Sequence, residues 1–260
     1  MSASILAWWH LSKESFLILR RDKIFVPVVV AGLAIAYFAN LASGWGLENF
    51  KKILFDIGLA GFRVTGAVVS ILWGVRMVTD PLQDRSIELR VASPAARFIW
   101  ILSRFTGLTV CLIFMGLVFT GVWQVLMYLN NFGAMSNAEG WALGLLVLEW
   151  LVLGALGILM GTLAGISTAL FVVFSAWIAG LLAPLVAATM DPNIDPTQKS
   201  FVEFIANVWN FQRFNIIDQL ETGARTVTLS DLIPRLTWAG AVLFGCLVLA
   251  SWVFQEKDLT

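Results

Sequence analysis

The stretch DRSIELRVASPAARFIWILSRF, residues 84–105, separates two long apolar runs. It carries four arginines, an aspartate and a glutamate, whereas the runs beside it carry few charges. Such charge is costly inside a bilayer, and an apolar run of about 20 residues can cross the roughly 30 Å hydrocarbon core. We therefore expect a loop between two spans of an all-α polytopic membrane protein.

The composition excludes several other classes of protein. Of the 260 residues, 59% are hydrophobic and only 13% are charged, which is too little charge to cover a soluble domain of this size. The formal net charge is zero, so no overall basic field attracts nucleic acid. The chain has a single histidine, and its two cysteines both lie inside apolar runs, so it lacks the usual set of metal ligands and catalytic side chains. We therefore expect no metal site, no cofactor and no catalytic residue.

Run length predicts six spans within a single transmembrane domain, 1–260. The expected spans are Ile24–Leu41, Ile57–Val78, Arg104–Leu129, Trp141–Ile166, Thr168–Met190 and Leu236–Phe254. Residues 1–23 form an amphipathic helix that should lie at the membrane interface. Residues 79–103 form the charged loop, and residues 191–235 form an outer helical segment with a helix near Thr197.

The distribution of Lys and Arg predicts that both termini lie in the cytoplasm. Most basic residues of the short loops fall on the side of the N-terminus, although Lys51 and Lys52 fall on the other side.

The charged loop has the composition of a docking element. Ser93 followed by Pro94 is typical of a helix start. A short helix before it would present apolar and charged side chains together, which suits a groove on a soluble partner. A solvated loop that only fixes the topology is equally compatible. The candidate docking residues are Asp84, Arg85, Ile87, Glu88, Leu89, Arg90, Ser93, Pro94 and Arg97.

Three glycines in the fourth expected span predict close helix packing. In GILMGTLAG, Gly157, Gly161 and Gly165 recur every four residues on one helix face. We expect another helix of the same chain, or of a second copy, to approach there.

Two charges lie inside expected spans. Arg63 lies about six residues into the second span and Glu149 about eight into the fourth, so both lie roughly 9 to 12 Å below the outer surface. Charges inside membranes usually face a partner in the protein interior. We expect Arg63 and Glu149 to face one another, within one chain or across a dimer. Otherwise Arg63 extends to the headgroups and Glu149 is neutral.

Four segments in this order resemble the permease subunit of ABC-2 type transporters. They are KESFLILRRDKIFVPVVV (13–30), DRSIELRVASPAARFIWILSRFTGL (84–108), GTLAGISTALFVV (161–173) and WVFQEKDLT (252–260). The chain departs from the family pattern at RSIE, where the family commonly has Gly-Thr, which leaves its subfamily open.

The resemblance implies a six-span half-transporter in a bacterial inner membrane. It makes the loop a coupling helix that docks on a separate cytoplasmic ATP-binding subunit, and it implies a second permease in a homodimer or heterodimer. The chain has no Gly-x-x-x-x-Gly-Lys-Ser/Thr motif, so we expect ATP hydrolysis in the partner and no enzyme activity here. A non-transporting scaffold that anchors a complex through this loop is the alternative. The transported substrate is not encoded in any recognisable pattern.

Overall fold

The computed structural model describes residues 3–20, 22–23, 25–43, 50–83, 94–189, 196–216 and 227–256. In this part of the chain the regular elements are eight α-helices and one short 3-10 helix. The α-helices are α1 (Ala3–Arg20), α2 (Phe25–Ser43), α3 (Phe50–Gln83), α4 (Pro94–Leu129), α5 (Asn137–Leu163), α6 (Ile166–Thr189), α7 (Pro196–Val208) and α9 (Leu229–Glu256). The 3-10 helix η1 spans Phe211–Phe214.

Five of these helices are long and apolar enough to cross a membrane, namely α3, α4, α5, α6 and α9. The chain therefore has the fold class expected of a multi-pass helical membrane protein. The apolar part of α2, Val26–Leu41, is shorter than these five.

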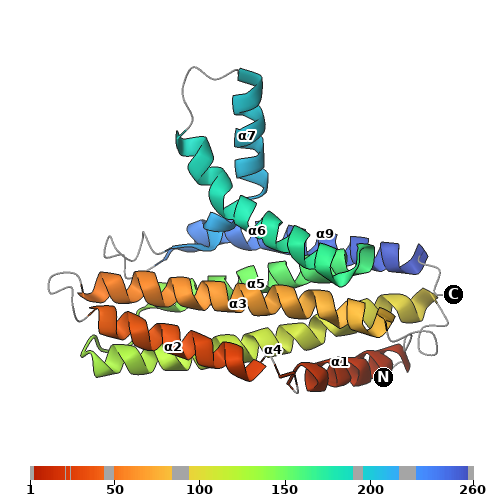
Figure 1. Cartoon of the computed structure of the whole chain (residues 1–260), viewed down its shortest axis with the longest axis horizontal. Coiled ribbons are helices and arrows are strands. Elements are labelled where there is room, and N and C mark those ends of the chain that lie inside the picture. The colour runs from red at the N-terminus through yellow and green to blue at the C-terminus, as the bar shows by residue number, and fades with distance from the viewer. Residues whose placement is uncertain are drawn as a thin grey trace.

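The long helices form a bundle in which α5 is central (Figure 1). It contacts α3 most extensively and also packs on α4, α6 and α9. The end of the bundle at which α3 ends and α4 begins is called the terminal end, because the N and C labels of Figure 1 lie on that side. The opposite end, at which α3, α5 and α9 begin, is called the far end.

Helix α1 packs against α4 at the terminal end. Its buried face consists of Ser12, Ser15 and Leu19, and Gly107 of α4 lets Ser15 approach closely. Trp9 is 58% exposed and Ile18 50% exposed. Helix α1 is therefore a bundle element that keeps large apolar side chains exposed, as an interfacial helix would require.

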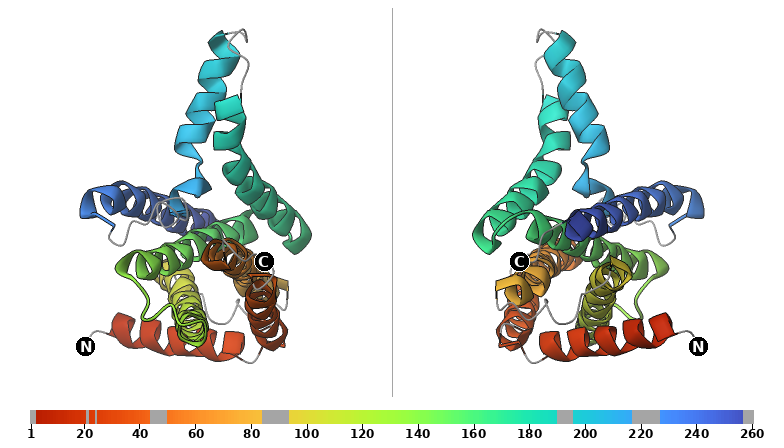
Figure 2. Two further views of the ribbon diagram at one scale, coloured as in Figure 1. Left: turned by 90° about the vertical axis from the view of Figure 1, so that its left-hand side faces the viewer. Right: turned by 90° about the vertical axis from the view of Figure 1, so that its right-hand side faces the viewer.

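Helices α6 and α7 form an arm that leaves the bundle (Figures 1 and 2). The views of Figure 2 show the arm projecting beyond α5 and α9. On α7, Phe201 and Phe204 are largely exposed. The segment after α7 returns to the bundle through η1, whose Phe211 and Phe214 are fully buried.

Several expected boundaries are wrong by a few residues. Residues 79–83, assigned to the charged loop, continue α3. Residues 94–103 begin α4, as the helix start at Ser93 and Pro94 predicts. Helix α5 ends at Leu163, before the expected end at Ile166, and α6 already begins at Ile166. Helix formation carries on past the apolar run because each additional residue completes a backbone hydrogen bond. Pro94 is the first residue of α4, as its missing N–H group favours.

Candidate functional site

A buried ion pair joins α3 to α5 toward the far end of the bundle. Arg63 Nε donates to Glu149 Oε2 at 2.8 Å. The Glu149 side chain is fully buried, and that of Arg63 is 13% exposed. The contact expected from the matched depths of the two charges is present, and it lies within one chain rather than across a dimer.

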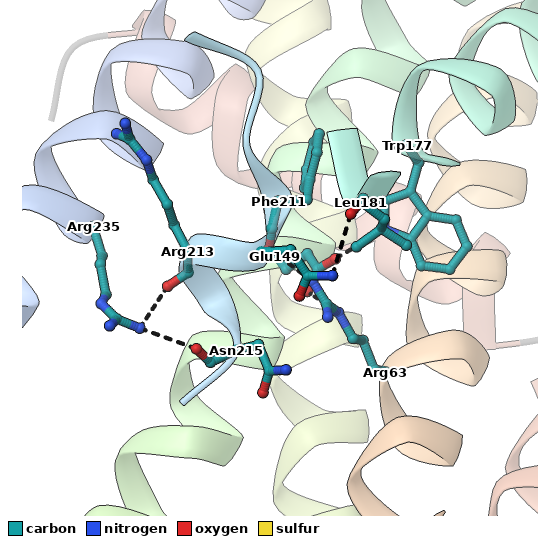
Figure 3. A network of polar contacts seen from close by, with 9 residues as sticks. Arg63, Glu149, Trp177, Leu181, Phe211, Arg213, Asn215 and Arg235 are labelled. Atoms are coloured by element: carbon teal, nitrogen blue, oxygen red, sulfur yellow. Dashed lines mark hydrogen bonds and ion pairs between the residues drawn. The ribbon is translucent and has the colours of Figure 1, made fainter. Parts of the chain in front are cut away.

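The ion pair is the centre of a larger polar network (Figure 3). Trp177 of α6 donates its indole N–H to Glu149 Oε1 at 2.8 Å, so both carboxylate oxygens accept a hydrogen bond. Arg63 Nη2 donates to the carbonyl of Phe211 in η1 at 2.7 Å. A buried carboxylate is tolerated only when it is paired and hydrogen-bonded, and these contacts meet that condition.

Close packing of α3 on α5 makes this geometry possible. A Cβ added to Gly66 would lie 1.9 Å from the Trp150 ring, and one added to Gly74 would lie 2.5 Å from the Gly154 carbonyl oxygen. The two backbones therefore approach more closely than larger residues would allow. The sequence reading missed Gly66, Gly74 and Gly154, because they lie outside the glycine repeat it relied on.

The predicted glycine face is correct at two of its three positions. A Cβ on Gly157 or Gly161 would lie about 3 Å from backbone atoms of Gly74 or Val75 on α3. The prediction for Gly165 is wrong: it lies beyond the end of α5, and no atom lies within 4 Å of its Cβ position. The glycine repeat therefore contacts α3 only at the two positions that lie within α5.

Indole and amide groups fasten the outer segment to the spans. Trp209 donates to the carbonyl of Ala176 at 2.7 Å, and Gln212 donates to that of Leu181 at 3.2 Å. In the other direction, Trp238 of α9 donates to the carbonyl of Val208 at 2.8 Å. The segment between α7 and α9 is thus held by directed hydrogen bonds as well as by apolar packing.

A second arginine holds the same segment from α9. Arg235 Nη1 donates to the carbonyl of Arg213 at 2.6 Å and to that of Asn215 at 3.4 Å (Figure 3). Arg63 and Arg235 therefore bind backbone carbonyls within η1 and directly after it. The sequence gives no signal for these contacts, since the acceptors are main-chain groups.

At the terminal end, the first turns of α4 are tied to the last turns of α9. Arg97 Nη1 donates to the carbonyl of Gln255 at 2.7 Å. The rings of Trp100 and Phe254 stack with centroids 5.0 Å apart and an interplanar angle of 14°. Arg104 lies over the Trp100 ring, 4.9 Å from its centroid.

The same part of α4 is also tied to α1, because Arg104 Nη1 donates to Ser15 Oγ at 3.1 Å. Of the docking residues expected from the sequence, Arg97 and the backbone of Pro94 are described. Those outside the described residues are Asp84, Arg85, Ile87, Glu88, Leu89, Arg90 and Ser93.

Comparison with protein-family models and with curated proteins finds no match to this chain. The fold by itself defines the class of the protein: it is all-helical in the described residues, with five candidate membrane-spanning helices. Its distinctive features are a buried charge network toward the far end and an α4 start linked to α1 and α9 at the terminal end.

Proposed function

We propose that the chain is the membrane-spanning permease subunit of an ABC-2 type transporter. In this proposal it moves a substrate across or out of a bacterial cytoplasmic membrane. The energy comes from ATP hydrolysed by a separate ATP-binding subunit that docks on residues 84–97. The resemblance of four ordered sequence segments supports the family.

The observation that carries the proposal is the continuity of α4. This helix has 36 residues, about 54 Å at 1.5 Å per residue, against roughly 30 Å of hydrocarbon. It begins at Pro94, directly after residues 84–93, and continues without a break through its apolar run. Because Arg97, Trp100 and Arg104 tie its first turns to α9 and α1, a displacement of the loop would move three helices together.

Six spans follow if α2 also crosses the membrane. Its 19 residues reach about 28 Å, and it packs along α3 within the bundle. With α2 as a span, an even number of crossings returns the chain to the side of its N-terminus. This agrees with the position of both termini at one end, which we assign to the cytoplasm.

The far-end network supports a gating role for the outer segment. Residues 196–216 approach α3, α6 and α9 through hydrogen bonds that a rigid-body shift of these helices would break. In a transporter this arrangement makes opening of the outer side depend on the helix positions. A packing role for the segment uses the same contacts.

The decisive experiment is purification of the tagged chain from its native membrane under mild detergent, followed by quantitative mass spectrometry. The transporter requires a co-purifying ATP-binding subunit, with two permeases and two ATPases in each complex. The second permease is this chain or a related one. Recovery of a stable complex that contains no ATPase would instead support the scaffold.

Replacing Glu88 and Leu89 with alanine tests the docking loop. The double variant should lower ATPase recovery and remove the effect of the permease on ATP hydrolysis, while membrane insertion stays normal. The conservative pair Glu88→Asp with Leu89→Met is the matched control and should retain both properties. Normal ATPase binding by the alanine variant would show that the loop serves only as a topology signal.

A further inference from the structure

A half-open cavity of about 340 Å³ is lined by residues of α1, α3 and α4 and by Asp22, which follows α1. It is separate from the far-end network, and it shares Arg104 with the contacts that tie the start of α4 to α1. Its volume is at the lower end of the roughly 300 to 1,000 Å³ typical of small-molecule pockets. It is therefore large enough for a polar headgroup but not for the acyl chains of a lipid.

Charges of both signs line this cavity. Arg76 of α3 lies 3.4 Å from a carboxylate oxygen of Asp22 and 3.4 Å from one of Asp80. Glu14 of α1 adds a third carboxylate, and Arg104 of α4 adds a second guanidinium. Among the described residues the lining thus carries three carboxylates and two guanidinium groups, so it offers partners to an anion and to a cation at once.

The cavity lies where apolar lining changes to charged lining. Along α3 it is bordered by Trp73 and Met77, and one turn later by Asp80. On α1 it is bordered by Ile18, which is half exposed. Such a change from apolar to charged side chains is typical of the headgroup level of a bilayer. A lipid whose headgroup is bound in the cavity could therefore leave its acyl chains in the bilayer beside Ile18.

A metal ion fits the cavity poorly. No group of three or more His, Cys, Asp or Glu side chains that could hold a metal occurs in the described ranges. The lining instead suits a ligand with an ammonium group and a phosphate a few bonds apart.

We propose that this cavity binds the phosphoethanolamine headgroup of a membrane phospholipid. The ammonium group is held by the carboxylates of Asp22 and Asp80, which both lie 3.4 Å from Arg76, and the phosphate is held by Arg104 and Arg76. Charge-assisted hydrogen bonds of this kind are stronger than neutral ones, and arginine suits phosphate because of its planar set of N–H donors. The site requires that the chain lie in a membrane, but not that it transports a substrate.

The proposal is tested by native mass spectrometry of the purified full-length chain. Protein in detergent is titrated with dioleoyl phosphatidylethanolamine, phosphatidylcholine or phosphatidylglycerol. We expect phosphatidylethanolamine to be retained at least about tenfold more strongly than phosphatidylglycerol, which lacks the cation. Phosphatidylcholine should bind more weakly than phosphatidylethanolamine, because its ammonium has no N–H to donate.

Two independent variants assign the binding to the cavity. Asp80→Asn and Asp22→Asn should each lower the retention of phosphatidylethanolamine by about tenfold. The control Glu203→Gln removes one carboxylate from exposed α7 and should retain it fully. If neither variant accumulates, the comparison of lipids on the wild-type chain still decides the question.

Soluble glycerophosphoethanolamine distinguishes a lipid from a free headgroup. Its failure to displace the lipid at equal concentration supports a membrane ligand, and equal competition would overturn that identification. Equal retention of phosphatidylethanolamine and phosphatidylglycerol, or unchanged retention in both Asp variants, would overturn the site itself. Occupancy seen only with a protein partner bound would assign the cavity to a protein interface instead.

Discussion

Inverting either charge of the Arg63–Glu149 pair should destabilise the protein severely. In Arg63→Glu, two carboxylates face each other where Glu149 is fully buried. In Glu149→Arg, two guanidinium groups meet at the same place. Breaking a buried pair costs about 3 to 5 kcal/mol, because the remaining charge stays buried without its partner. At roughly 2 to 4 °C per kcal/mol, each single variant should lose about 6 to 20 °C of thermal stability.

The swapped variant, Arg63→Glu with Glu149→Arg, should recover only part of this loss. It restores the ion pair but reverses the groups that face two fixed partners. Glutamate at position 63 would face the carbonyl of Phe211, which Arg63 Nη2 contacts. Arginine at position 149 would face the indole N–H of Trp177, which cannot accept a hydrogen bond. We expect recovery of about half of the summed loss, which a double-mutant cycle measures directly.

The assay is heating of the purified protein in one detergent, followed by gel filtration to measure the fraction that remains monodisperse. Because unfolding of such proteins is often irreversible, apparent transition temperatures are compared at one heating protocol. Lys199→Glu with Glu203→Lys is the control, since both residues lie on the exposed side of α7 and should tolerate inversion. A swap as unstable as the sum of the two single variants would refute a direct contact.

Two further substitutions test the surroundings of this pair. Trp177→Phe removes the hydrogen bond to Glu149 and should lower stability by about 1.5 to 3 kcal/mol in the same assay; an unchanged transition would mean that this bond is absent. Gly74→Val places side-chain atoms against the backbone of Gly154 and should cost about 1 to 3 kcal/mol or more. Gly245→Val is its control, because no atom lies within 4 Å of that Cβ position, and equal losses in the two variants would contradict the close packing of α3 on α5.

The depth of the two intramembrane charges could be predicted because it depends on one dimension only. The start of an apolar run and the rise of 1.5 Å per residue place Arg63 and Glu149 at similar levels. An unpaired charge at that level is costly, so a partner at the same level follows from energetics. The start of α4 at Pro94 is predictable for a similar local reason, since proline lacks the N–H group that a helix interior uses.

Which other groups join the ion pair depends on how α5 and α6 are rotated about their axes and on how the segment after α7 folds back onto the bundle. Trp177 reaches Glu149 only because α6 packs on α5 with that face inward. The carbonyl of Phe211 reaches Arg63 only because the segment after α7 folds back onto the bundle. A main-chain acceptor has no residue-type signature, so no sequence pattern could single it out.

The sequence alone thus determined the helical class, most apolar runs, and the two charges that need a partner, because these follow from hydrophobicity and helical rise along one chain. Only the tertiary structure decided that the pair closes within one chain and that Gly165 lies outside the α3–α5 contact. It also decided that α4 is fastened to both α1 and α9. These features require the relative rotation of helices far apart in sequence, which packing of the whole bundle determines.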